Sequence, residues 1–136
     1  MSTARAHGLT LRALSTFLVL DVGFRLLGFD KVYRFIVRRR PGSALWAPEE
    51  GRLRAQRTFE AVQGATMFYY RRRKDCLPKA LTTFHLLRRQ GIPADLCFGV
   101  RKFPFAAHTW VESFGEPLDD NPARVRQFTI IHRAAS

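Results

Sequence analysis

The chain has 136 residues, which suits one folded domain that we place at 1–136. Hydrophobic residues make up 46% and charged residues 25%, a composition that excludes an intrinsically disordered protein. The chain has 23 Lys and Arg against 11 Asp and Glu, which gives a net charge of +12. This charge predicts an acidic partner, such as nucleic acid, an anionic lipid surface or an acidic peptide.

Residues 1–70 form a part that we expect to be helical. The segment from Leu9 to Phe29 is apolar on most faces, and Asp30 is predicted to cap a second helix that ends at the basic run 38–40. Pro41 begins a break, and Pro48 suits the first turn of a third helix. Apolar and small residues recur in this third helix at helical spacing, which predicts core packing. They are Ala55, Phe59, Val62, Thr66 and Tyr69.

The apolar run from Ala13 to Leu20 is too short to span a membrane, since a spanning helix needs roughly 20 apolar residues. No small-residue cleavage site follows it, so no signal peptide is predicted. The only two cysteines, Cys76 and Cys97, exclude a disulfide framework and indicate a reducing compartment. We therefore expect a cytoplasmic protein, and weak association with a membrane surface through this Arg-flanked segment stays open as an addition.

Residues 71–136 have a different pattern. Asp75 is predicted to cap a helix that ends at Gly91 and whose apolar face is Leu77, Ala80, Leu81, Phe84 and Leu87. Alternating residues then predict strands at 96–101, 107–113, 118–120 and 125–131, with a turn at 114–117. The order predicts an α+β fold, in which N-terminal helices precede one helix packed on a small antiparallel meander. The arginine runs at 38–40, 71–74 and 88–89 are interpreted as solvated helix ends.

Cys76 is placed at the start of that helix, where unpaired N–H groups and the helix dipole favour a thiolate. His108 on a strand is a candidate base, and Asp120 on the next strand is a candidate acceptor that would orient the His108 ring. Cys, His and Asp in this order are consistent with a nucleophilic triad. From these residues alone, a small buried cysteine, a core histidine and a loop-starting acid are equally good interpretations. Neither cysteine has zinc-ligand spacing, and no metal or cofactor is predicted.

Several short motifs follow one another from Cys76 onward. They are Cys76-Leu77, Leu86 to Ala94, Phe98 to Lys102, Phe105 to Glu112, and Gly115 to Asp120. Together these motifs resemble the leader peptidases of lasso-peptide biosynthesis, a family of the transglutaminase-like superfamily, and they cover about a third of the chain closely. Thr109 stands where alanine is commoner in the family. A spacing of twelve residues after the histidine favours Asp120 over its neighbour Asp119 as the triad acid.

The resemblance implies a transglutaminase- or papain-like core and a cysteine endopeptidase with Cys76, His108 and Asp120 as its triad. Such an enzyme removes the leader from a lasso-peptide precursor, and a separate ATP-dependent cyclase then closes the released core peptide. Many members carry a fused leader-binding domain, for which 136 residues leave no room, so we expect a separate leader-recognition protein. The family usually cleaves after a leader whose penultimate residue is threonine.

Three other functions remain open on the sequence. A transglutaminase-like acyltransferase would use the same triad, because hydrolysis and acyl transfer share the acyl-enzyme. A basic nucleic-acid-binding module would explain the charge of +12, although no recognised binding motif is present. An assembly subunit with a silent triad is the third.

Overall fold

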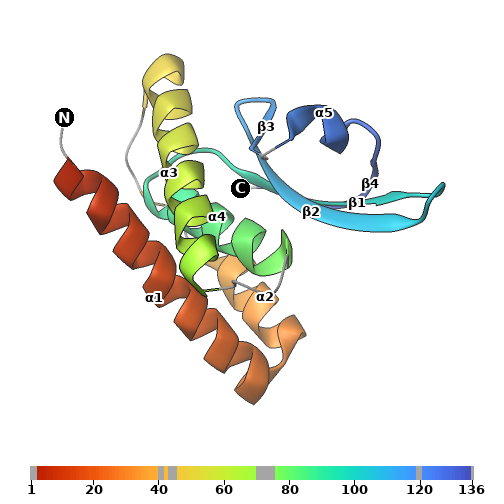
Figure 1. Cartoon of the computed structure of the whole chain (residues 1–136), viewed down its shortest axis with the longest axis horizontal. Coiled ribbons are helices and arrows are strands. Elements are labelled where there is room, and N and C mark those ends of the chain that lie inside the picture. Colours follow the sequence, from red (N-terminus) through yellow and green to blue (C-terminus); the bar gives the residue numbers. More distant parts are fainter. Residues whose placement is uncertain (1–2, 40–41, 43–45, 70–75, 119–120, 136) are drawn as a thin grey trace.

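The computed structural model of the chain describes residues 3–39, 42, 46–69, 76–118 and 121–135. It has the expected α+β architecture, with helices α1 and α3 on one side, a four-stranded antiparallel sheet on the other, and helix α4 between them (Figure 1). The elements are α1 Thr3–Leu27, α2 Phe29–Arg38, α3 Pro48–Tyr69, α4 Cys76–Arg89, β1 Asp95–Arg101, β2 Ala106–Ser113, β3 Glu116–Leu118, α5 Pro122–Val125 and β4 Thr129–Ala135.

The break between α1 and α2 lies at Gly28, and this corrects the predicted cap of the second helix. Gly28 is the N-cap residue and has φ 81°, a left-handed conformation that glycine adopts without strain. Asp30 instead lies in the first turn of α2, where its carboxylate pairs with Arg34 at 3.0 Å. The aspartate still faces the positive end of the helix dipole, but the backbone reversal is made by the glycine.

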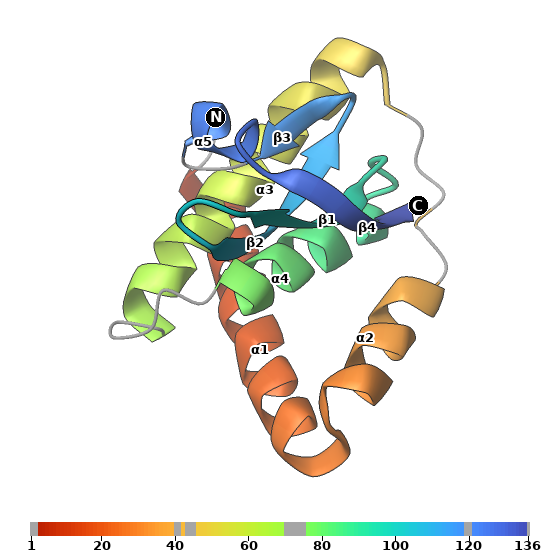
Figure 2. The same ribbon diagram turned by 90° about the vertical axis from the view of Figure 1, so that its right-hand side faces the viewer.

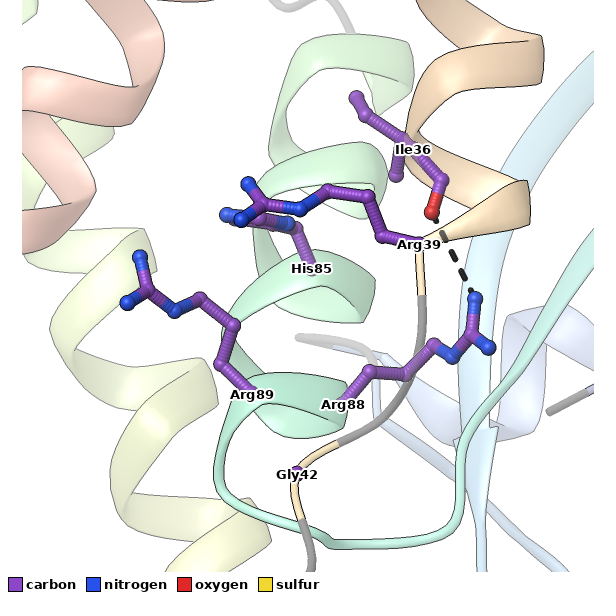
Figure 3. A pocket seen from close by; sticks show the side chains of 6 residues that line it. All are labelled: Ile36, Arg39, Gly42, His85, Arg88 and Arg89. Atoms are coloured by element: carbon purple, nitrogen blue, oxygen red, sulfur yellow. Dashed lines mark hydrogen bonds between the residues drawn. The ribbon is translucent and has the colours of Figure 1, made fainter.

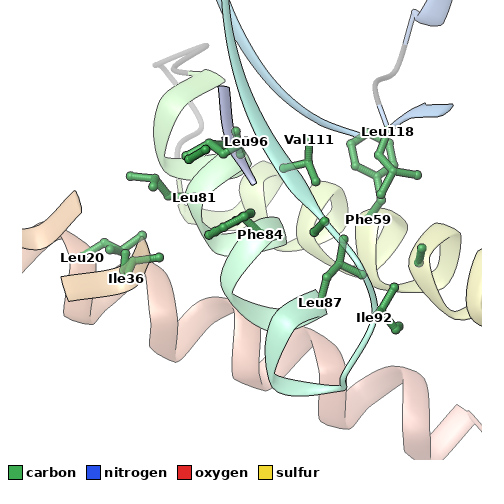
Figure 4. Close-up of a cluster of buried hydrophobic side chains, with 14 of the residues drawn as sticks. Leu20, Ile36, Phe59, Leu81, Phe84, Leu87, Ile92, Leu96, Val111 and Leu118 are labelled. Carbon is green, nitrogen blue, oxygen red and sulfur yellow. The ribbon is translucent and has the colours of Figure 1, made fainter. Parts of the chain in front are cut away.

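Helix α4 is the central element of the core. Its residues Ala80, Leu81, Phe84 and Leu87 are buried, which confirms the predicted apolar face (Figure 4). Helix α4 packs against α1 and α3 on one side and against strands β1 and β2 on the other. Figure 2 shows α4 directly beneath the sheet. Because fully burying one leucine or phenylalanine is worth about 1.5–3 kcal/mol, this contact fixes where the start of α4 lies relative to β2.

The sheet has the strand order β3-β2-β1-β4, so the predicted simple meander is wrong for the last strand. The chain leaves β3 at one edge and returns along β1 at the other edge. The connection contains α5, which ends at Val125, the residue where the sequence predicts the last strand to begin. Asn121 caps this helix by accepting a hydrogen bond from the Arg124 N–H at 3.3 Å, and Pro122 occupies its first turn. Asparagine before proline is a helix-start signal that outweighs the apolar character of Val125.

The turn between β2 and β3 is shorter than expected. Phe114 and Gly115 both have positive φ, 52° and 77°, as a two-residue hairpin turn requires. Strand β3 therefore begins at Glu116, two residues before the expected Leu118. Within the described part of the chain, no helix combines the length and the apolar character needed to cross a membrane.

Candidate active site

Cys76 is the first residue of α4, and its thiol is free and half-buried. The first turn of a helix leaves backbone N–H groups unpaired, and the dipole makes this end positive. Both effects favour a thiolate at this position. The predicted cap Asp75 and the basic run 71–74 lie outside the described residues.

His108 lies on β2, and its side chain is hydrogen-bonded to the thiol of Cys76. The adjacent residue Thr109 also reaches this sulfur, through its backbone N–H and through its hydroxyl. Consecutive strand residues point to opposite faces, so one sulfur can meet both side chains only beside an edge of the sheet. Among the described residues, β3 pairs with β2 over Val111–Ser113 and not at His108 or Thr109.

These contacts set the pKa of the Cys76 thiol below its ordinary value. Burial acts in the opposite direction and is the largest single effect, because it disfavours the charged thiolate. The hydrogen bond from His108, the N–H of Thr109, the charge of His108 and the hydroxyl of Thr109 together outweigh burial. The site thus combines a thiolate-favouring sulfur with an imidazole in contact with it, which is the chemical requirement for nucleophilic catalysis.

The His108 ring is held from behind by aromatic packing. It stacks on Trp110 with ring centroids 5.7 Å apart and contacts Phe128 at 5.5 Å. The Trp110 indole N–H lies 3.4 Å from Glu112 Oε1, and Glu112 is bound in turn by Arg133 at 2.7 Å. His108, Trp110 and Glu112 therefore share one face of β2, as the strand alternation predicts.

Gly99 on β1 makes this packing sterically possible. A Cβ atom at Gly99 would lie 2.7 Å from Trp110 Cη2, closer than real Cβ contacts come, and 3.0 Å from Phe128 Cβ, which is tighter than most of them. Gly99 is paired across the strands with His108 itself. The absence of a side chain at Gly99 therefore lets Trp110 lie flat under the imidazole.

The second cysteine has the opposite environment. Cys97 on β1 is fully buried, and burial, followed by the nearby carboxylate of Glu112, raises its pKa to about 12. A neutral, inaccessible thiol is not a nucleophile. The difference between Cys76 and Cys97 agrees with the sequence-based choice between them.

The structure brings two of the three expected triad residues together, Cys76 and His108. The third, Asp120, lies outside the described residues together with Asp119, so the choice between the two aspartates stays a prediction. Sequence reasoning missed the contact of Thr109 with the sulfur and treated this residue only as a departure from the family pattern. Its position next to His108 was the available signal.

Comparisons with known proteins identify the family of the chain. A family model described as the transglutaminase-like superfamily matches residues 17–133. The microcin J25-processing protein McjB of Escherichia coli is 34% identical over 59 residues, which is 43% of this chain and 28% of that protein. The matched stretch thus spans little more than a quarter of the relative. No solved structure matches the chain significantly.

Proposed function

The chain belongs to the transglutaminase-like superfamily, and we propose that it acts as a cysteine endopeptidase that removes the leader from a lasso-peptide precursor. The observation that carries the proposal is the hydrogen bond between His108 and the half-buried Cys76 thiol at the start of α4. The partial similarity to a protein named for processing microcin J25 supports the choice of a peptide precursor as substrate.

In the first half of the reaction, the Cys76 thiolate attacks the carbonyl carbon of the leader–core peptide bond. The unpaired N–H groups at the start of α4 supply hydrogen-bond donors for the oxyanion that forms. His108, as imidazolium, gives its proton to the departing amine of the core peptide. The carbon–nitrogen bond breaks, and the leader remains on Cys76 as a thioester.

In the second half, the neutral His108 takes a proton from a water molecule, which attacks the thioester carbonyl. The carbon–sulfur bond breaks, the leader leaves as a carboxylic acid and the Cys76 thiolate is restored. We assign Asp120 as the acceptor that holds the His108 ring and stabilises its cationic form. Packing by Trp110 and Phe128 supports the same ring orientation.

We further propose that a separate leader-recognition protein presents the precursor, and that an ATP-dependent cyclase consumes the released core peptide. The leader peptidase would work in the reducing cytoplasm, where Cys76 stays a thiol. Cleavage of a dilute precursor should then be faster when a leader-binding protein is added.

The test incubates the full chain with a synthetic leader–core peptide, with and without a leader-binding protein, and follows the products by mass spectrometry. Cleavage at a single leader–core bond is expected for the parent and for Cys97→Ala, and none for Cys76→Ala. Folding of the variants is checked by circular dichroism. A folded Cys76→Ala variant that still cleaves the precursor would refute the assignment.

The same assay separates hydrolysis from acyl transfer. A transglutaminase-like acyltransferase passes the acyl group to an amine, so the leader mass would increase by that of the added amine with loss of water. Addition of a primary amine should leave the products of a peptidase unchanged.

A further inference from the structure

A small pocket lies away from Cys76, where the C-terminal ends of α2 and α4 meet. It is lined by Ile36, Arg39, Gly42, His85, Arg88 and Arg89, and its volume is about 130 Å³ (Figure 3). A water molecule occupies roughly 30 Å³ in the liquid, so a pocket of this size has room for a compact ion. Three of the lining residues are arginines, and Figure 3 shows the guanidinium groups of Arg39 and Arg89 on the side of His85 and that of Arg88 pointing toward the end of α2.

Arg88 is buried, which corrects the interpretation of the 88–89 run as a solvated helix end. Its side chain is only 9% exposed, and one terminal nitrogen donates to the backbone carbonyls of Val37 at 2.7 Å and Ile36 at 3.5 Å. These bonds cap the end of α2. The Nε atom of Arg88, however, is buried without a hydrogen-bond partner. An unsatisfied charged donor of this kind is costly.

The described residues do not balance the positive charge of the pocket. None of the residues that the structure describes along its wall is acidic, and none of the ion pairs in the described part of the chain involves its three arginines. The effect is visible on His85, whose pKa is lowered to about 4 by burial first and then by the charges of Arg39, Arg89 and Arg88. His85 is thus neutral at physiological pH and adds a polar ring to a cationic site.

The remaining wall is backbone that comes very close to α4. The Gly42 N–H donates to the Arg88 carbonyl at 2.7 Å, and a Cβ atom at Gly42 would lie 2.3 Å from the Arg89 carbonyl oxygen. No residue with a side chain fits there without a backbone shift. The pocket is therefore built from a glycine contact, a buried arginine and two partly solvated arginines.

We propose that this pocket binds a phosphate group. Guanidinium groups present paired donors that match phosphate oxygens, and charge-assisted bonds of this type are stronger than neutral ones. Two guanidinium groups on one side of the pocket, those of Arg39 and Arg89, favour an ion of more than one charge over a single carboxylate. The solvated ends of Arg39 and Arg89 would share the phosphate oxygens, and Arg88, whose guanidinium group points toward the end of α2, would line the site with its stem.

The phosphate can come from a free ion or from the headgroup of an anionic lipid, and the chemistry of recognition is the same. Arg39 and Arg89 are exposed, so a headgroup can reach the pocket from outside. The site is separate from Cys76, and its occupation is independent of the proposed peptidase activity.

The experiment measures binding of inorganic phosphate to the full chain by isothermal titration calorimetry, against sodium chloride at matched ionic strength. Arg39→Gln and Arg89→Gln are the test variants, because both side chains are exposed and their loss should leave the fold intact. Arg126→Gln, the exposed C-cap residue of α5 beside the sheet, removes the same charge elsewhere. Phosphate should bind about 10-fold or more weakly to each pocket variant and unchanged to Arg126→Gln.

A second measurement locates the ion. The ring signals of His85 in the NMR spectrum should shift on addition of phosphate to the parent and not to Arg39→Gln. Vesicles of phosphatidylcholine with and without phosphatidic acid then identify the source, because binding that needs both the acidic lipid and Arg89 assigns a headgroup. Absence of phosphate binding to the parent, equal weakening by Arg126→Gln, or binding of an acidic peptide in place of phosphate would overturn the proposal.

Discussion

Replacing His108 by alanine should change the reactivity of the Cys76 thiol before any peptide is present. Burial raises the pKa of this thiol, and among the described residues the lowering contributions come from His108 and Thr109. His108 supplies two of them, the strongest hydrogen bond and a charge effect, so its removal takes away the larger part of what the described residues set against burial. The pKa of Cys76 must therefore rise in the variant.

The sign of the effect on reactivity follows from the reactive form. The thiolate is the nucleophile, so at a pH below the pKa each unit of increase lowers its population about 10-fold. In the parent, alkylation should reach half its maximal rate at a lower pH than it does for an ordinary thiol. In His108→Ala this midpoint should move to higher pH. Peptide cleavage should fall further, by roughly 10²–10⁴-fold, because the proton transfers to the amine and from water are lost as well.

The assay measures the rate of iodoacetamide labelling against pH by mass spectrometry, in a Cys97→Ala background that leaves one thiol. The control is labelling of the chain that keeps both cysteines. There Cys97 should stay unlabelled, because it is buried and its pKa is raised to about 12. An unchanged pH profile in folded His108→Ala would show that the imidazole does not set the state of Cys76. The combined His108→Ala and Cys76→Ala variant should cleave no worse than either single variant, because the two residues act as one unit.

Three further predictions concern neighbouring residues. Thr109→Val removes the hydroxyl that bonds Cys76 and should move the pH midpoint of Cys76 alkylation upward, by less than His108→Ala does. Thr109→Ser keeps a hydroxyl and should keep the midpoint of the parent. Gly99→Ala should lower the free energy of unfolding by about 1–3 kcal/mol in urea titrations and reduce cleavage, because its Cβ atom would displace the indole beneath the imidazole. Gly64→Ala, with open space around its added atom, should instead be neutral or slightly stabilising. Asp120→Ala should lose on the order of 10²-fold or more in cleavage rate and Asp119→Ala little; the reverse would make Asp119 the residue that orients His108.

Local patterns were sufficient for most elements of the fold. The spacing of Leu81, Phe84 and Leu87 predicted the buried face of α4, because a helix repeats every 3.6 residues wherever it packs. The alternation around His108 likewise predicted which residues share its face of β2. The choice of Cys76 over Cys97 also came from the sequence, since a helix start and a buried strand differ in local pattern.

Strand pairing and burial depended on the tertiary structure. That β4 lies beside β1 follows from where α5 carries the chain, and a four-residue helix is too short to leave a periodic signal. The pair Arg88 and Arg89 looks alike in sequence, yet one is buried against the end of α2 and the other is exposed.

The sequence by itself therefore determined helices α1 to α4, strands β1 and β2 and the residue types of the candidate site, because these depend on neighbours a few positions apart. Only the tertiary structure decided that Thr109 meets the sulfur of Cys76 and that arginines from the ends of α2 and α4 line one pocket. Both depend on where α4 packs against β2 and α2, segments far apart in the chain. Those contacts result from burial of the whole core, and no short stretch of sequence contains that information.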